Sequence, residues 1–225
     1  MRFSWLAAKR RWLGRRNFDA PFREFLDTPF PHGKTRFAQC EFVCLDIETT
    51  GLDAKRAHIL SAGWVLIRGG RVALSTCESQ LIRPEGEVGD SAAVHGLTDT
   101  VVESGQAESV VFSRIVKALT GRALVVHHAG LDKTMLDRLC MNQFGCPLPV
   151  PVVDTMALEL ERRQRRHHIA EKQSLRLADL RRAYGLPYYQ AHDCLVDAIA
   201  TAELLIAMVA AHDGPDKTRL SRLVG

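Results

Sequence analysis

Two acids inside a strand-like run limit what this chain can fold into. Residues 42–52 read FVCLDIETTGL, where the apolar residues predict a buried strand and only Ile47 separates Asp46 from Glu48. Side chains alternate between the two faces of a strand, so both carboxylates must point to the same side. Like charges held that close repel each other, and burial disfavours each charge further. The pair therefore requires a compensating cation, for which a metal ion is the candidate.

The composition is that of a globular chain with a substantial core. Its 225 residues are 46% hydrophobic and 25% charged, which suits one domain with an appendage. No apolar run approaches the roughly 20 residues that a membrane span needs, so we expect no membrane partner. The six cysteines form no CxxC pair, and several lie in apolar stretches. Free buried thiols favour a reducing compartment, and we expect the protein to be cytoplasmic.

The basic residues gather at the N-terminus. Residues 1–16 contain six Lys or Arg and no acid, which leaves 24 basic residues against 26 acids in the remainder. Such an arm could lie along phosphates, contact an acidic partner, act as an Arg-rich targeting segment, or be a solvated helical extension. We expect a basic arm with a short helix at 1–36, the main domain at 37–213 and a tail at 214–225.

The hydrophobic pattern predicts a mixed α/β sheet flanked by helices. Expected strands are 42–48, 58–68, 71–83 and 123–127, with a Gly69-Gly70 turn between the second and third. Expected helices are 107–119, 131–143, 155–170, 174–184 and 194–211.

Three more polar residues stand where a core is expected. Asp132 shares a helical face with Leu136 and Leu139, while Asp197 lies on a face of its helix that is otherwise uncharged. His192 comes just before that last helix. Each residue also has an ordinary explanation, because Asp132 could cap its helix and His192 could be a surface or capping residue. Asp193 is the better cap for the final helix, which leaves Asp197 without a structural explanation.

These residues together resemble the motifs of the DnaQ-like DEDD exonucleases, in the subgroup with a catalytic histidine. Asp46 to Gly51 matches the first motif, Asp-x-Glu-Thr-Thr-Gly. Residues 127–132, HHAGLD, resemble the second, although His128 stands where the family usually has Asn. His192 and Asp197 match the third, and residues 94–98, VHGLT, resemble a further family loop.

The resemblance implies a fold, a cofactor and a role for each residue. The fold would be a ribonuclease H-like mixed five-stranded sheet flanked by helices, with a short N-terminal helical extension. The activity would be 3′–5′ exonucleolytic release of nucleoside monophosphates from DNA, in proofreading or repair. Two Mg²⁺ or Mn²⁺ ions would be the cofactors. The implied metal ligands are Asp46, Glu48, Asp132 and Asp197, with His192 as the general base. The implied residues around the terminal nucleotide are Thr49, Thr50, Gly51, Leu52, His95 and His127.

Several alternatives remain open at this point. The expected partner is DNA with single-stranded or frayed 3′ ends, and a DNA polymerase is a further candidate partner. The same fold and ligands also serve exoribonucleases, so RNA is the alternative substrate. A non-catalytic nucleic-acid-binding or polymerase-accessory module would keep the fold, and a nucleotide phosphohydrolase would use the His192-Asp193 pair. The arginine-rich run at 161–168 either guides phosphates or is a solvated helix face.

Overall fold

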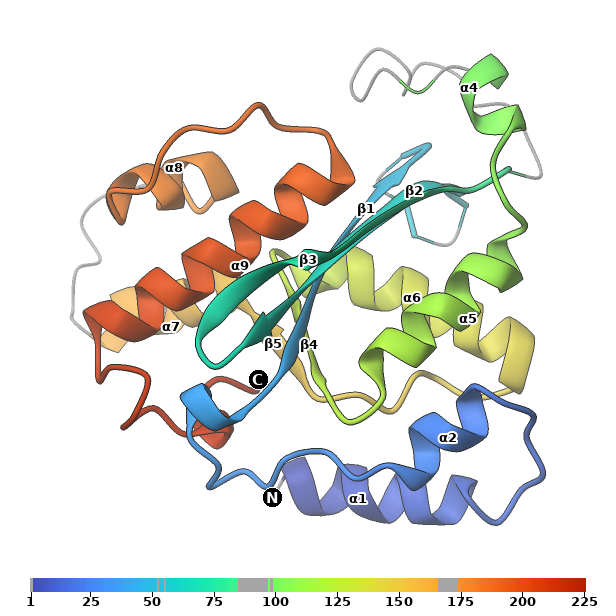
Figure 1. Ribbon diagram of the computed structural model, residues 1–225, viewed down its shortest axis with the longest axis horizontal. Coiled ribbons are helices and arrows are strands. Elements are labelled where there is room, and N and C mark those ends of the chain that lie inside the picture. Colours follow the sequence, from blue (N-terminus) through green and yellow to red (C-terminus); the bar gives the residue numbers. More distant parts are fainter. Residues whose placement is uncertain (1, 52, 55, 85–96, 98, 166–173) are drawn as a thin grey trace.

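The computed structural model describes residues 2–51, 53–54, 56–84, 97, 99–165 and 174–225. A five-stranded sheet crosses the molecule in the order β3-β2-β1-β4-β5 (Figure 1). The strands are β1 (Phe42–Thr49), β2 (Ile59–Arg68), β3 (Arg71–Leu81), β4 (Ala123–Val126) and β5 (Val152–Asp154). The pairs β1–β2 and β2–β3 are antiparallel, while β1–β4 and β4–β5 are parallel. The predicted mixed sheet is therefore confirmed.

The turn between β2 and β3 is the one that the sequence predicts. Gly69 and Gly70 have φ angles of +56° and +71°. A two-residue hairpin whose residues both have positive φ is compatible with the twist of the flanking strands, and glycine adopts it without steric penalty.

β1 is the central strand, and it is paired unequally on its two sides. It pairs with β2 along its whole length, but with β4 only through Phe42–Cys44. The half of β1 that carries the two acids therefore has a strand partner on one side only.

Helices cover both faces of the sheet (Figure 1). On one face lie α7 (Thr155–Arg165), α8 (Leu177–Ala183) and α9 (Cys194–Ala211), and on the other lie α5 (Glu108–Leu119) and α6 (Ala129–Phe144). α1 (Arg2–Leu13) and α2 (Phe22–Asp27) cover the edge of that second layer, and α4 (Asp99–Glu103) is a single short turn. Two 3₁₀ turns, Phe37–Gln39 and Leu220–Arg222, complete the described elements.

The alternation along β1 sends its side chains into two separate cores. Leu45 and Ile47 join the core that contains α5 and α6, whereas Phe42 and Cys44 join the core under α9. Asp46 continues the second series. The acids are thus on the α9 side of the sheet.

The structure departs from the pattern-based expectations in three places. β5 forms where the sequence pattern predicts no strand, because it has only three residues. The short helix α4 was also not expected. Residues 1–36 contain two helices, α1 and α2, where the sequence predicts one short helix.

α9 is, within the described residues, the helix long and apolar enough to span a membrane by length and composition alone. Half of that stretch is buried inside the protein, where it packs against β1 and β2. Its apolar character is therefore that of a central core helix.

Candidate active site

The two acids of β1 lie opposite the small residues of β2. Asp46 pairs with Gly63, and Glu48 pairs with Ser61, in the antiparallel register. Cross-strand partners point to the same face of the sheet, so small residues there leave room above the carboxylates. The first turn of α9 fills that room.

Gly63 is what lets α9 come so close to the sheet. A Cβ atom at this position would lie 2.4 Å from the backbone nitrogen of Leu195 and 2.5 Å from the carbonyl carbon of Cys194. A real Cβ cannot approach backbone atoms that closely, so only glycine fits without displacing the helix. The absence of one side chain on β2 thereby brings the N-terminal turn of α9 beside Asp46.

α9 and the residue before it supply the next two groups. Asp193 caps the helix by accepting hydrogen bonds from the backbone N–H groups of Leu195 (2.9 Å) and Val196 (3.1 Å). The backbone N–H of His192 donates to Asp197 Oδ2 at 2.8 Å. His192 has a φ of +72°, a left-handed conformation that turns the chain sharply into the helix. The expected division of roles between Asp193 and Asp197 is thus present.

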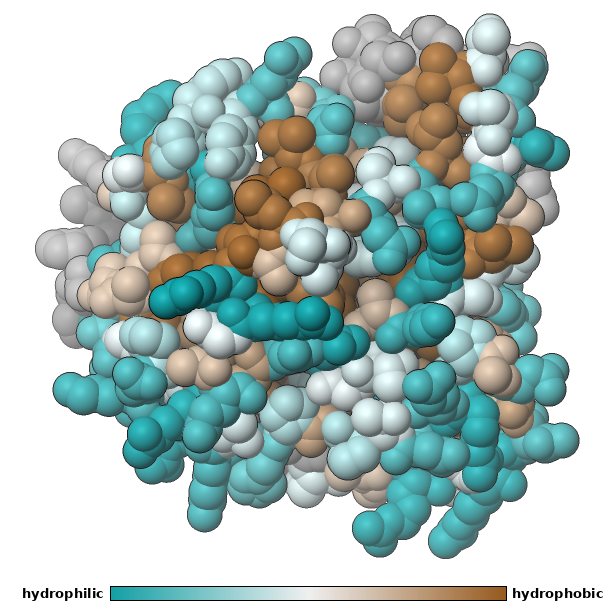
Figure 2. Space-filling view, viewed as in Figure 1, coloured by the Kyte–Doolittle hydropathy of each residue, from teal (hydrophilic) through white to brown (hydrophobic). Residues whose placement is uncertain are grey.

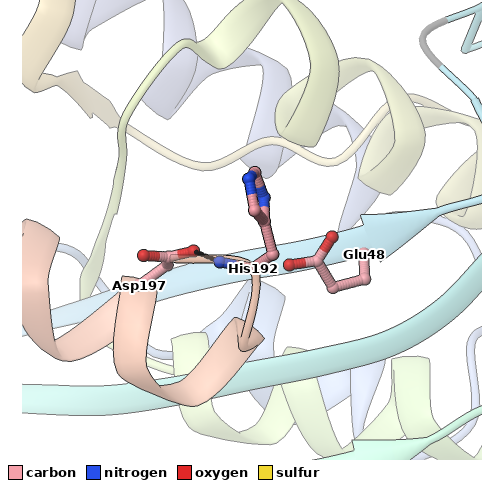
Figure 3. A group of neighbouring side chains, drawn as sticks. All are labelled: Glu48, His192 and Asp197. Carbon is pink, nitrogen blue, oxygen red and sulfur yellow. Dashed lines mark hydrogen bonds between the residues drawn. The ribbon is translucent and has the colours of Figure 1, made fainter. Parts of the chain in front are cut away.

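Glu48, His192 and Asp197 form a compact cluster (Figure 3). One potential ligand atom from each residue lies within 4.8 Å of the other two. In Figure 3 the carboxylates of Asp197 and Glu48 lie on either side of His192, whose ring projects away from the helix. Residues far apart in the sequence therefore meet at one point above β1.

Asp132 approaches the same place from the other layer. It lies in the first turn of α6 and is buried, with 4% of its surface exposed. Burial raises the pKa of this carboxyl group, and the neighbouring backbone of Ile47, on the half of β1 that lacks a β4 partner, partly opposes that rise. Asp132 therefore lies beside the other acids and is not the N-cap of α6, which is His128.

Asp154, at the end of β5, holds α6 in place and was not singled out from the sequence. Its Oδ2 accepts a hydrogen bond from the N–H of Ala129 at 2.9 Å, and its Oδ1 accepts from the N–H of His128 at 3.1 Å. Oδ1 also caps α7 by accepting from Met156 and Ala157. One carboxylate therefore joins the starts of two helices. In the sequence its only signal is Asp-Thr before a helical run, which is typical of any N-cap.

The two histidines of the second motif, His127 and His128, are held by contacts and backbone geometry within the protein. His127 Nδ1 lies 2.8 Å from Thr155 Oγ1, and His127 Nε2 lies 2.9 Å from the carbonyl oxygen of Leu175. Both ring nitrogens of His127 are thus engaged within the protein, which favours a positioning role over direct substrate contact. His128 has a φ of +88°, in the left-handed region where Asn, Asp and His are the commonest residues after glycine.

The threonines after the acids shape the turn that follows β1. Thr49 Oγ1 donates to the carbonyl of Gly51 at 2.8 Å, and Thr50 Oγ1 accepts from the N–H of His58 at 2.9 Å. A bulge between Glu48 and Thr49 re-aims the chain here. Of the other predicted substrate contacts, Leu52 and His95 lie outside the described residues.

The carboxyl groups of the site influence each other strongly. Burial raises the pKa of Asp46 well above its usual value, and repulsion from Asp132, Asp197 and Glu48 adds to this shift. Burial raises the pKa of Glu48 to about 7, with further contributions from Asp197 and Asp193. Burial likewise raises the pKa of Asp132 and of Asp197. Burial therefore raises the pKa of all four carboxyl groups, and repulsion from the other three adds to the shift at Asp46.

This donor set fits hard divalent cations. Carboxylate oxygens are the ligands that Mg²⁺ and Mn²⁺ prefer, and nearby positive charge would relieve the mutual repulsion. A cation held beside Glu48, His192 and Asp197 would therefore offset the repulsion that the two acids of β1 experience.

Comparison with known proteins gives the same assignment. A family model described as Exonuclease (RNase_T) matches residues 43–205. The "DNA polymerase III subunit epsilon" of Treponema pallidum is 31% identical over 176 residues, covering 76% of this chain and 77% of that protein. A "DNA polymerase III PolC-type" from Thermotoga maritima is 28% identical over 188 residues, or 83% of this chain. The match spans 13% of that much longer relative.

A solved structure with the same fold is exonuclease I of E. coli in complex with a dT13 oligonucleotide. It superposes with a TM-score of 0.66 at 18% identity, over 78% of this chain and 42% of the other. The architecture is ribonuclease H-like, as the motif resemblance implied. Because the family model spans most of the chain and includes both acids of β1 as well as Asp132, His192 and Asp197, this chain belongs to the exonuclease family.

Proposed function

We propose that the protein is a metal-dependent 3′–5′ exonuclease that releases nucleoside monophosphates from DNA 3′ ends, in proofreading or repair. The observation that supports it most is the convergence of Glu48, His192 and Asp197 within 4.8 Å. Asp46 and Asp132 are coupled to the same site by charge. The dT13 complex of exonuclease I supports a single-stranded DNA substrate, and the epsilon-subunit relative supports association with a DNA polymerase.

The acids of the site would hold two divalent ions, which supply neutralisation of the charge that develops on the phosphate and lower the pKa of the attacking water. Asp46 is central, since the charges of Asp132 and Asp197 both act on its carboxyl group. Glu48 and Asp197 lie on the α9 side, while Asp132 enters from α6.

His192 would act as the general base. Its ring is exposed and lies between the carboxylates of Glu48 and Asp197. A ring nitrogen in that place would accept the proton of the attacking water. The hydrogen bond from the His192 backbone N–H to Asp197 fixes the backbone of His192 and leaves its side chain unrestrained.

The turn after β1 would border the terminal nucleotide. The hydrogen bonds of Thr49 and Thr50 fix the backbone at 49–51. Capture of a free 3′ end here is what would make the enzyme an exonuclease.

The test is degradation of 5′-labelled single-stranded DNA and RNA of the same sequence, with Mg²⁺ or Mn²⁺. We expect a DNA ladder that shortens from the 3′ end. Asp46→Asn should reduce kcat by more than about 10³-fold, because several kcal/mol of charge stabilisation are lost. His192→Ala should reduce kcat by about 10²–10⁴-fold, the range for a general base.

The same experiment separates the alternatives. Faster degradation of RNA than DNA would replace the proposal by an exoribonuclease. If the protein binds either oligonucleotide but shows no cleavage that depends on Asp46, it would instead be a non-catalytic module.

A further inference from the structure

The first helix presents two different faces. On one, Arg10 and Leu13 are buried, with 6% and 0% of their surfaces exposed. On the other, Trp5 and Trp12 remain 64% and 60% exposed, although large aromatic side chains gain most from burial. The two tryptophans are seven residues apart, so they share one side of α1 and lie about 10.5 Å apart along its axis.

The buried face ties α1 firmly to the rest of the fold. The Arg10 guanidinium donates to the carbonyls of Phe25, Leu26 (3.1 Å) and Thr28 (2.7 Å), and it lies 3.9 Å from the ring centre of Phe30. A helix held by these contacts presents its outer face in a fixed orientation. That face is a preformed surface and does not depend on a free-moving tail.

The outer face is cationic as well as aromatic. Lys9 Nζ lies 5.2 Å from the ring centre of Trp5, Arg11 is exposed on α1, and Arg15 is exposed in the turn that follows α1. In the part of the chain that the structure describes, neither Arg11 nor Arg15 forms an ion pair.

The other arginine-rich segment is different, because its charges are already used. Arg162 and Arg163 both pair with Glu159, at 3.0 Å and 2.9 Å. Arg165 pairs with Glu161 at 2.6 Å. Of the two segments that could attract phosphates, α1 is therefore the one whose described charges are available.

We propose that the outer face of α1, formed by Trp5, Lys9, Arg11 and Trp12, together with Arg15 in the turn that follows, binds single-stranded DNA at a second place, away from the active site. Exposed indole rings offer stacking platforms for unpaired bases, and guanidinium groups pair with phosphates. The proposal rests on the proposed function, since it assigns a further contact for the same substrate.

A lipid surface fits this face less well. An interfacial helix needs a broad apolar side to insert, and the buried Leu13 of α1 already points inward. Lys9 lies against the ring of Trp5, and Arg11, next to Trp12 in the sequence, is exposed, so charged groups accompany both rings. Stacking on separate platforms with phosphates between them is the better match.

The place of α1 makes the role specific. α1 lies near the end of the sheet where β1 begins, whereas the acids lie toward the other end of β1 (Figure 1). The eight residues of β1 alone span about 26 Å. A single DNA strand would thus be bound by its 3′ end in the site and by a more distant segment on α1. Loss of the α1 surface should therefore weaken binding only of DNA long enough to reach both places.

The test compares variants in DNA binding without catalysis. Fluorescence anisotropy of 5′-labelled dT30 in EDTA should show binding weakened about tenfold or more by Trp5→Ala with Trp12→Ala. Arg11→Glu with Arg15→Glu should weaken binding and make the slope of log K against log salt less negative by about 1.4, or 0.7 for each lost phosphate contact. The matched control is Arg114→Glu with Lys117→Glu, an equal change of charge on α5.

Hydrolysis then tests the length dependence. The ratio of kcat/KM for dT30 to that for dT4 should fall about tenfold in the tryptophan variant. Equal loss of dT30 binding in the α5 control, or unchanged binding in both α1 variants, would overturn the proposal. The proposal would also be overturned if the α1 variants lost binding to anionic phospholipid vesicles but still bound dT30 as the wild-type protein does. If the wild-type protein hydrolyses neither oligonucleotide yet binds dT30 through α1, the proposed function fails while this surface stands.

Discussion

Single residues set the geometry of the site through the backbone as much as through their side chains. His128 turns the chain from β4 into α6 with a φ of +88°, and Asp154 holds that turn by accepting hydrogen bonds from the N–H groups of His128 and Ala129. Asp132, four residues after His128, depends on both for its position. The turn is thus a support for Asp132 and the carboxyl groups around it.

The conformation of His128 gives a direct prediction. His128→Asn should keep the stability and the activity, because Asn adopts the left-handed region readily. His128→Val should lower the free energy of unfolding by roughly 1–2 kcal/mol, since a β-branched residue is strained there. Urea denaturation of the two variants measures the difference, with His128→Asn as the matched control. Equal stability of both variants would show that the turn relaxes at no penalty.

The residues that the sequence revealed are those that violate a pattern. Asp46 and Glu48 interrupt a buried strand, and Asp197 interrupts an apolar helix, so each needed an explanation. Asp154 violates nothing, because an acid before a helix is ordinary. Gly63 also looks ordinary in a strand. Its importance comes from Leu195, which is distant in sequence, and only the tertiary structure brings the two together.

At the scale of elements, the site depends on how closely α9 lies against the sheet. Gly63 allows the contact, and the capping group of Asp193 fixes where the helix begins. The long, regular elements were predictable from their hydrophobic periods. β5 was not, because a strand of three residues is too short to show alternation, and it forms through pairing with β4.

Gly63→Ala should separate the two halves of the site. The added methyl group would overlap the backbone of Cys194 and Leu195, so α9 must shift. We expect a loss of about 1–3 kcal/mol of stability, as for other overpacked positions, and weaker Mn²⁺ binding. Thermal melting and Mn²⁺ titration measure these effects. Gly51→Ala, where a Cβ meets nothing within 4 Å, is the control for stability.

Arg181 joins α8 to α9 and to the segment that leads into His192. Its guanidinium is buried and donates to the carbonyl of Ala200 (2.8 Å), the carbonyl of Pro187 (3.0 Å) and Glu203 Oε2 (2.8 Å). Arg181→Ala should lower the free energy of unfolding by about 3 kcal/mol or more, because it leaves a partly buried carboxylate and two carbonyls without their donor.

The next residue provides the control for Arg181. The side chain of Arg182 is 78% exposed and pairs only loosely with Asp179, at 3.6 Å. Arg182→Ala should change stability by less than about 0.5 kcal/mol. Chemical denaturation of the two variants compares them, and similar losses would contradict the positioning role of Arg181.

At the scale of the whole molecule, charge is distributed unevenly. The first 16 residues carry six basic side chains, while the remainder is slightly acidic. Figure 2 shows a face on which hydrophilic and hydrophobic residues interleave, with an apolar group over the elements near α9. The basic side chains of the N-terminal arm and the carboxyl groups of the site are thus two separate concentrations of like charge.

Stability without metal should consequently fall as the pH rises. The pKa of Glu48 is about 7 in the folded protein, above its value of about 4.3 in an unfolded chain. A raised pKa stabilises the fold fully below the unfolded value, and this contribution is lost as the pH rises through about 7. We expect the EDTA-treated protein to lose melting temperature between pH 5.5 and 8, and Mn²⁺ to restore it more strongly at pH 8.

Glu48→Gln isolates this effect from the other titrating groups. The amide cannot ionise, so the drop in melting temperature between the two pH values should be smaller in the variant. An unchanged drop would assign the pH dependence to other residues.

The aromatic contacts of the arm bear on where this protein can be divided. Phe22 stacks on Phe144 with ring centres 4.2 Å apart, and Phe18 packs edge-on against both rings. Phe144 is the last residue of α6, the helix that brings Asp132 to the site at its other end. Removal of residues 1–36 would expose the aromatic surface around Phe144 and would favour self-association. The arm therefore shields the helical layer that holds Asp132.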